Sequence, residues 1–298
     1  VLNALIPDNP LVEMIATLDL SDANGAQTKE DIFTGPSQWM PHGRVFGGQV
    51  LAQSLVAATR TVEGRPVHSL HGYFLRPGDI NLPITFSVDR LRDGRSFSTR
   101  RVQAYQKGEP IFSMIASFQD EDPGLNHQDE FPNDIPAPET LASAAELIGD
   151  NPHPVAQYWA KARPFDMRHV GTPIYFKVEG KPVAHQAVWL KALGDLPADD
   201  ALHTAALAYA SDYSILESIY RAHGIAWAHP GLKSASLDHA MWFHRQARVD
   251  EWMLYVQESP SAQGGRGLAL GRIFSRDGIL LATVAQEGMV RVPELKSK

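Results

Sequence analysis

The sequence predicts an α+β fold made of two similar halves, each with one helix and a set of antiparallel strands. Three landmarks support this prediction, because each occurs twice and in the same order. The pairs are Tyr73–Arg76 with Trp242–Arg245, Asp93–Arg95 with Gly264–Arg266, and Lys107–Gly108 with Asp277–Gly278. Their shifts of 169, 171 and 170 residues are nearly constant. Such a constant shift indicates an internal duplication.

The first half contains one helical pattern followed by strand patterns. Gly47, Gly48 and Gln49 open a helix over residues 50–59, in which apolar residues recur at helical spacing. Runs typical of strands cover residues 69–75, 83–91, 96–106 and 111–119.

The second half repeats this order. Apolar residues from Leu202 to Ile219 form one stripe of a predicted helix over residues 201–221. Its predicted strands cover residues 235–243, 252–258, 267–275 and 280–290. One helix wrapped by a long antiparallel sheet is the hotdog arrangement. Two such units in one chain predict a double hotdog.

An acidic connector is predicted between the halves. Residues 108–160 contain no Lys or Arg, and residues 120–138 are rich in Pro, Asp, Glu and Asn without periodicity. We therefore divide the chain into an N-terminal unit (1–120), a linker (121–150) and a C-terminal unit (151–298).

Composition excludes several classes of protein. The chain has 298 residues, 44% hydrophobic and 20% charged, with a net charge of −7, as in ordinary globular proteins. No apolar run approaches the roughly 18 residues that a membrane span needs, and no signal peptide or basic nucleic-acid stripe is visible. Cysteine is absent, which removes disulfides and thiolate sites and fits a reducing compartment.

Three polar residues of the second half are candidates for chemistry. Asp212 falls on the buried helical stripe, where a carboxylate is costly unless it is hydrogen-bonded or used. The first half has no Asp between His42 and Gly78, so the fold does not require one. Gln286 corresponds to Ala116 at the 170-residue shift, and Ser236 starts a predicted strand. Together they indicate that one half carries the chemistry.

Metal and cofactor signatures are not found. His68 with His71, and His239 with His244, do not match a zinc motif. Asp238 and His239 are adjacent in a strand and should point to opposite faces, which argues against a shared role. No nucleophile elbow, P-loop or dinucleotide motif is present. We expect no metal and no cofactor.

The chain resembles the acyl-CoA thioesterase II family, the double-hotdog hydrolases related to the bacterial TesB enzyme. The resemblance runs from about residue 40 to residue 292. It rests on residues 43–49 (GRVFGGQ), 68–79 (HSLHGYFLRPGD), 209–212 (YASD), 236–245 (SLDHAMWFHR) and 286–288 (QEG).

This resemblance implies hydrolysis of fatty acyl-CoA to a free fatty acid and CoA. The family uses an Asp, a Thr or Ser, and a Gln, which by motif are Asp212, Ser236 and Gln286 here. Asp212 would accept a proton from water that Ser236 and Gln286 hold. Backbone N–H groups at a helix N-terminus are the expected oxyanion donors.

Two alternative functions stay open at this point. A hotdog enoyl-CoA hydratase or dehydratase would use His68 or His71 as its base. A non-enzymatic acyl-CoA binder would explain the fold but not three polar residues gathered in one half.

Exposed sheet edges predict a homo-oligomer, with a tetramer as the family-based expectation. The chain ends in Leu295-Lys296-Ser297-Lys298 rather than Ser-Lys-Leu, so a cytoplasmic location is expected.

Overall fold

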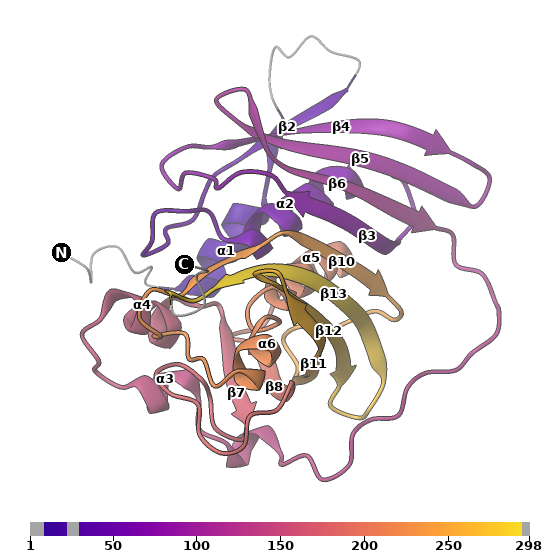
Figure 1. Cartoon of the computed structure of the whole chain (residues 1–298). Helices are drawn as coiled ribbons and strands as arrows, with labels where there is room; N and C mark the ends of the chain where they lie inside the picture. Colours follow the sequence, from indigo (N-terminus) through magenta and orange to yellow (C-terminus); the bar gives the residue numbers. More distant parts are fainter. Residues whose placement is uncertain (1–8, 23–29, 294–298) are drawn as a thin grey trace.

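A single antiparallel sheet runs through both halves of the molecule (Figure 1). The computed structural model describes residues 9–22 and 30–293. Its 13 strands are ordered β1-β2-β4-β5-β6-β3-β10-β13-β12-β11-β8-β7, with β9 also paired to β13. The strands are β1 (Ser21–Asp22), β2 (Asp31–Gly35), β3 (Val67–Phe74), β4 (Ile84–Asp93), β5 (Phe97–Gln106), β6 (Glu109–Gln119), β7 (Phe165–Val170), β8 (His185–Ala192), β9 (Lys233–Ser236), β10 (Asp238–Phe243), β11 (Met253–Gln263), β12 (Arg266–Ser275) and β13 (Leu280–Arg291).

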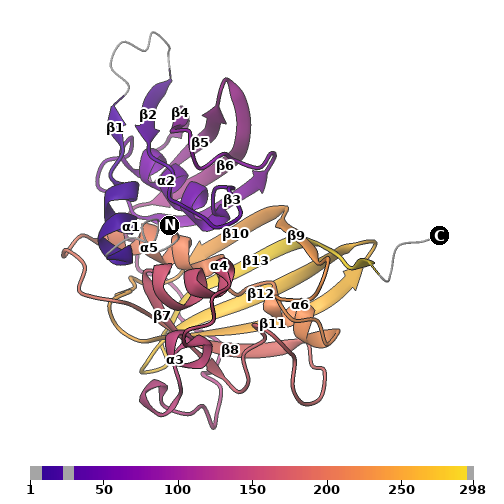
Figure 2. The same cartoon turned by 90° about the vertical axis from the view of Figure 1, so that its left-hand side faces the viewer.

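The helices lie mainly on the inner side of the curved sheet (Figures 1 and 2). They are α1 (Pro10–Leu18), α2 (Gly47–Thr59), α3 (Ala144–Ile148), α4 (Pro154–Gln157), α5 (Asp200–Ser211) and α6 (Glu217–Ala222), with a 3₁₀ turn at Pro138–Thr140 and a π-helical turn at Tyr158–Ala162. Each half thus has a central helix wrapped by sheet. This confirms the predicted α+β double hotdog.

The two central helices pack against each other. The backbones of α2 and α5 approach so closely that a Cβ on Gly48 would lie 2.3 Å from the Tyr209 carbonyl oxygen. A contact this short requires glycine at the start of α2. The close packing brings the first turn of α2 to the C-terminal end of α5.

The prediction of one helix over residues 201–221 is wrong. α5 ends at Ser211, and α6 begins only at Glu217. The intervening turn contains Asp212 and Ser214, whose side chains form hydrogen bonds outside the helix. Tyr255 donates to the carbonyl of Ser211 at 2.9 Å and so satisfies one acceptor at the helix end.

The predicted strands match the structure with two departures. The predicted strand 252–258 is too short, because β11 continues to Gln263. The range 235–243 is two strands, β9 and β10, separated by Leu237. The sequence patterns did not indicate α1, β1, β2, α4, β7 or β8, which are short or lie outside the duplicated landmarks.

The two halves are joined by strand pairing between β3 and β10. In this antiparallel pair Ala240 lies opposite His71. The connector passes along the outside of the second half (Figure 1), where Phe131 packs on Trp189 and Phe274 and Asp129 pairs with Arg272 at 3.0 Å. The predicted linker also contains α3.

Candidate active site

Asp212 lies at the C-terminal end of α5, where the chain leaves the helix. It is the C-cap residue rather than a member of a continuous helical stripe. By surface area the side chain is half-buried, while protein atoms enclose its carboxyl group. This desolvation raises the pKa of Asp212 to about 6, against hydrogen bonds from Gln286, Gly48 and Ser236 that lower it.

The structure brings all three predicted residues together around this carboxylate. Gln286 Nε2 donates to Asp212 Oδ1 at 3.0 Å, and Ser236 Oγ donates to the same oxygen at 3.2 Å. Gln286 Nε2 also lies 2.8 Å from Ser236 Oγ. The carboxylate, the hydroxyl and the amide therefore form a closed triangle of polar groups.

The first half also contributes to the site. The backbone N–H of Gly48 in the first turn of α2 donates to Asp212 Oδ2 at 2.8 Å. The positive end of the α2 dipole therefore faces the carboxylate and stabilises its ionised form. A Cβ on Gly47 would lie 2.6 Å from the same oxygen. The Gly-Gly pair was a sequence signal for the helix start but not for this contact.

A one-residue irregularity places Ser236 at the site. Ser236 lies opposite Gly288, whereas Ala240 lies opposite Ala285, so four residue steps on one strand match three on the other. The extra residue is Leu237, and Asp238 Oδ1 accepts from the Glu287 backbone N–H at 2.6 Å there. Such a bulge re-aims the flanking side chains.

His239 is a site residue that the sequence analysis did not select. As expected for adjacent strand residues, Asp238 and His239 have different partners. His239 is fully buried: its Nδ1 is hydrogen-bonded to Gln286 Oε1, and its Nε2 lies 2.9 Å from Ser211 Oγ. Burial lowers the pKa of His239 to about 4, so the ring is neutral at pH 7. Its contact with Gln286 depends on the register of β10 and β13, which the sequence alone does not give.

A second buried polar cluster lies beside α6, apart from the Asp212 contacts. Glu217 accepts from Trp227 Nε1 at 2.8 Å and from Gln186 Nε2 at 2.9 Å, and it lies 2.9 Å from His169 Nε2. These contacts satisfy a fully buried carboxylate and lower the pKa of Glu217 below its usual value despite the cost of burial. The cluster connects α6 to β7 and β8.

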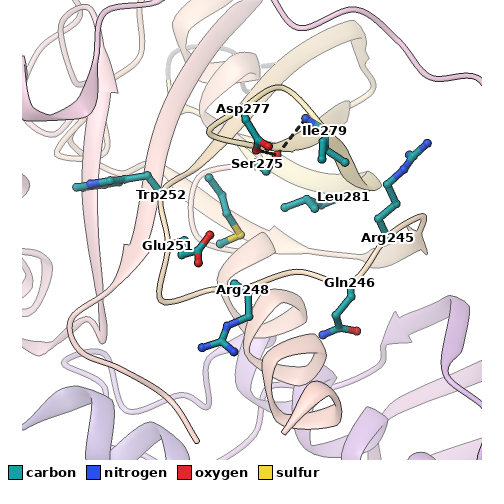
Figure 3. A pocket seen from close by; sticks show the side chains of 10 residues that line it. Arg245, Gln246, Arg248, Glu251, Trp252, Ser275, Asp277, Ile279 and Leu281 are labelled. Atoms are coloured by element: carbon teal, nitrogen blue, oxygen red, sulfur yellow. Dashed lines mark hydrogen bonds between the residues drawn. The ribbon is translucent and has the colours of Figure 1, made fainter. Parts of the chain in front are cut away.

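A metal-binding cluster and a surface pocket are the other candidates for a functional site. Among residues 9–22 and 30–293, no group of three or more His, Asp or Glu side chains is placed to hold a metal ion. Figure 3 shows a pocket between the loop at residues 245–252 and the β12–β13 turn, lined among others by Arg248 and Trp252. None of the three predicted residues lines this pocket. Within the same described ranges, no helix has the length and apolar character of a membrane span.

Family models match both halves of the chain. Residues 35–119 match the acyl-CoA thioesterase N-terminal domain, and residues 161–289 match the acyl-CoA thioesterase model. Acyl-coenzyme A thioesterase 8 of Homo sapiens is 42% identical, covering 88% of this chain and 85% of that protein. The chain belongs to the acyl-CoA thioesterase family.

Other relatives support this assignment. Acyl-CoA thioesterase 2 of Haemophilus influenzae is 41% identical over 88% of this chain and 93% of its own. The crystal structure of acyl-CoA thioesterase II TesB2 from Mycobacterium marinum is 44% identical with a TM-score of 0.75, covering 95% of this chain and 98% of that one. A tesB protein of Mycobacterium avium subs paratuberculosis is 33% identical with a TM-score of 0.77, covering 95% and 100%. The predicted family and fold are thus confirmed.

Proposed function

We propose that this thioesterase hydrolyses fatty acyl-CoA with a water molecule that Asp212 activates and that Ser236 and Gln286 hold. The reaction class follows from the family; the residue roles are our proposal. One observation carries them: an enclosed carboxylate receives hydrogen bonds from the hydroxyl, the amide and a helix N-terminus. The products are a free fatty acid and CoA.

Asp212 is suited to act as a general base. Its pKa of about 6 leaves it ionised at neutral pH while making it more basic than an ordinary Asp. In the proposed step, Asp212 takes a proton from water as the water oxygen bonds to the thioester carbonyl carbon. Collapse of the tetrahedral intermediate breaks the C–S bond, and the proton that Asp212 took from water passes to the CoA sulfur, which leaves as the thiol and restores the ionised carboxylate.

Ser236 and Gln286 are suited to orient the attacking water. Both lie within hydrogen-bond reach of Asp212 Oδ1, so a water at this oxygen meets a hydroxyl and an amide as well. Holding water in one orientation removes part of the entropic cost of the attack. Backbone N–H groups at the start of α2 are the expected donors to the developing oxyanion, although the Gly48 N–H itself donates to Asp212 Oδ2.

The alternatives make different demands on the site. A hydratase that used His71 would need it near the substrate, but His71 is exposed on β3 and its ring contacts Trp242. His68 Nε2 lies 2.8 Å from Ser117 Oγ of β6. A non-enzymatic acyl-CoA binding protein would have no chemical use for the enclosed Asp212 carboxylate.

Release of free CoA thiol from decanoyl-CoA tests the proposal. Thiol release that depends on Asp212 supports it. Consumption of an enoyl-CoA without release of thiol would indicate a hydratase, and ligand binding without turnover would indicate a binder.

A cytoplasmic location and a homo-oligomer, with a tetramer as the expected form, remain part of this proposal. Size-exclusion chromatography with light scattering tests the oligomeric state.

A further inference from the structure

His239 occupies a position that packing alone does not explain. A buried imidazole is costly unless both ring nitrogens are satisfied. At the 169-residue shift of the first landmark, His239 corresponds to Leu70; Gln286 corresponds to Ala116 at the 170-residue shift. Leu70 and Ala116 are direct register partners in the first half. The fold therefore accepts an apolar pair where the second half has an imidazole beside an amide.

The hydrogen bonds assign the protons of this network. Asp212 Oδ1 can only accept when ionised, so the Gln286 amide must present its NH₂ group to it. Gln286 Oε1 then faces His239, and Nδ1 of the neutral ring must carry the hydrogen that Oε1 accepts. Nε2 must then accept from Ser211 Oγ, 2.9 Å away, so in this assignment the single hydroxyl hydrogen of Ser211 points to the ring rather than to the Ala208 carbonyl oxygen at 2.8 Å. This assignment leaves no donor facing a donor.

We propose that His239 is a positioning residue, which holds the Gln286 side-chain oxygen so that the amide NH₂ points at Asp212 and Ser236. The inference rests on the proposed roles of those three residues. Without His239, no ring N–H holds the Gln286 side-chain oxygen, and the amide can move away from Asp212 and Ser236. That movement removes a donor from the carboxylate and from the water-binding position.

This role affects the acid limb of the pH profile. The donor that Gln286 supplies lowers the pKa of Asp212, so its loss raises that pKa and moves the limb to higher pH. The nearby phenols of Tyr158, Tyr220 and Tyr255 have pKa values raised partly by the Asp212 charge, and they stay neutral between pH 5 and 9. Asp238 faces the Glu287 backbone N–H instead, and burial raises its pKa. His239 itself is neutral throughout this range.

Four variants of the full chain test the proposal: His239→Leu, His239→Asn, His239→Gln and Gln286→Ala. His239→Leu copies the first-half residue and should lower kcat for decanoyl-CoA by about 10- to 100-fold with KM little changed, as expected when a reacting group is misplaced. His239→Asn carries an amide N–H near the place of Nδ1 and should recover most of kcat. The longer side chain in His239→Gln places its amide N–H beyond the position of Nδ1, so this variant should not recover kcat. The acid limb of kcat/KM should lie at higher pH in the Leu variant than in the Asn variant.

The double variant His239→Leu/Gln286→Ala separates this role from a general loss of structure. If His239 acts only through Gln286, the double variant should be no more than about threefold slower than Gln286→Ala alone, because effects of residues that act as a unit do not add. Normal kcat in His239→Leu, or fully multiplicative losses, would overturn the proposal. If His239→Leu does not fold, equal kcat and equal acid limbs in the Asn and Gln variants would overturn it. Normal kcat in Gln286→Ala would instead reject the proposed function.

Discussion

The two hotdog halves share a backbone but differ in what they place at equivalent positions. Both halves of the sheet have a one-residue irregularity at the same place: near Val67 in β3, and near Ser236 between β9 and β10. The first half places Val67, Leu70 and Ala116 there, and the C-cap residue of its central helix α2 is Arg60. The second half places Ser236, His239 and Gln286 there, and the C-cap residue of its helix α5 is Asp212. The polar set is thus an addition to the fold rather than a requirement of it.

The first half also contributes a group to the proposed site. Its helix N-terminus, at Gly48, supplies a hydrogen bond to Asp212. The proposed site therefore draws on both halves: the second gives the side chains, and the first gives a backbone N–H at a helix N-terminus.

Replacing Asp212 should have the largest effect. Asp212→Asn keeps the shape of the side chain but removes the base, so we expect kcat to fall by about 10²–10⁴-fold. Stopped thiol-release assays at pH 8 measure this change. Activity within tenfold of wild type would show that the second-half carboxylate is not the base.

The same variant should not lose stability. A folded-state pKa raised from 3.8 to about 6 means that ionised Asp212 opposes folding by up to about 3 kcal/mol above pH 6, and not at all below pH 3.8. The gain in stability from removing the charge is partly offset in Asp212→Asn, because the NH₂ group of Asn then faces one of the donors that bond to the Asp212 carboxylate. Denaturant unfolding should give a free energy at pH 8 equal to or above wild type, with the difference smaller at pH 5. A lower value at pH 8 would mean that Asp212 is structural.

Gln286→Ala copies the first-half residue at the position of Ala116. Without the amide the water is held by fewer groups, and we expect kcat to fall by about 10- to 100-fold while KM changes little. Saturation kinetics with decanoyl-CoA separate the two parameters. A rise in KM alone would place Gln286 in substrate binding instead.

Ser236 should show a smaller and chemically selective effect. Ser236→Ala removes one hydrogen bond and should cost about tenfold in kcat, or about 1.4 kcal/mol of transition-state stabilisation. Ser236→Thr keeps the hydroxyl and should stay near wild type. Equal losses in the Ala and Thr variants would show that the hydroxyl is not what this position contributes.

A first-half control should show the smallest effect. His71 is exposed on the outer face of β3 and contacts Trp242 rather than the site. We expect His71→Ala to keep kcat within about twofold, since surface changes away from functional groups are nearly neutral. A collapse of kcat in a folded His71→Ala protein would revive the His-based alternative.

The sequence predicted the repeat, the long strands and the three residues of the triangle. These follow from local patterns: alternation in the strands, paired landmarks, and polar residues in only one copy. It did not predict the break after Ser211, where partners from distant parts of the chain, such as Tyr255, bond to the helix end. It also missed the bonds of Gly48 and His239, since both partners lie far along the chain and are set by helix packing and strand register.

The pH dependence of kcat/KM for the wild-type enzyme tests the central claim, a buried second-half carboxylate acting as base, most directly. Because the active form of Asp212 is ionised, kcat/KM measured with decanoyl-CoA between pH 4.5 and 8.5 should be level above about pH 7 and fall about tenfold per pH unit well below pH 6. A profile that stays level down to pH 5 would contradict the assignment of Asp212 as the base.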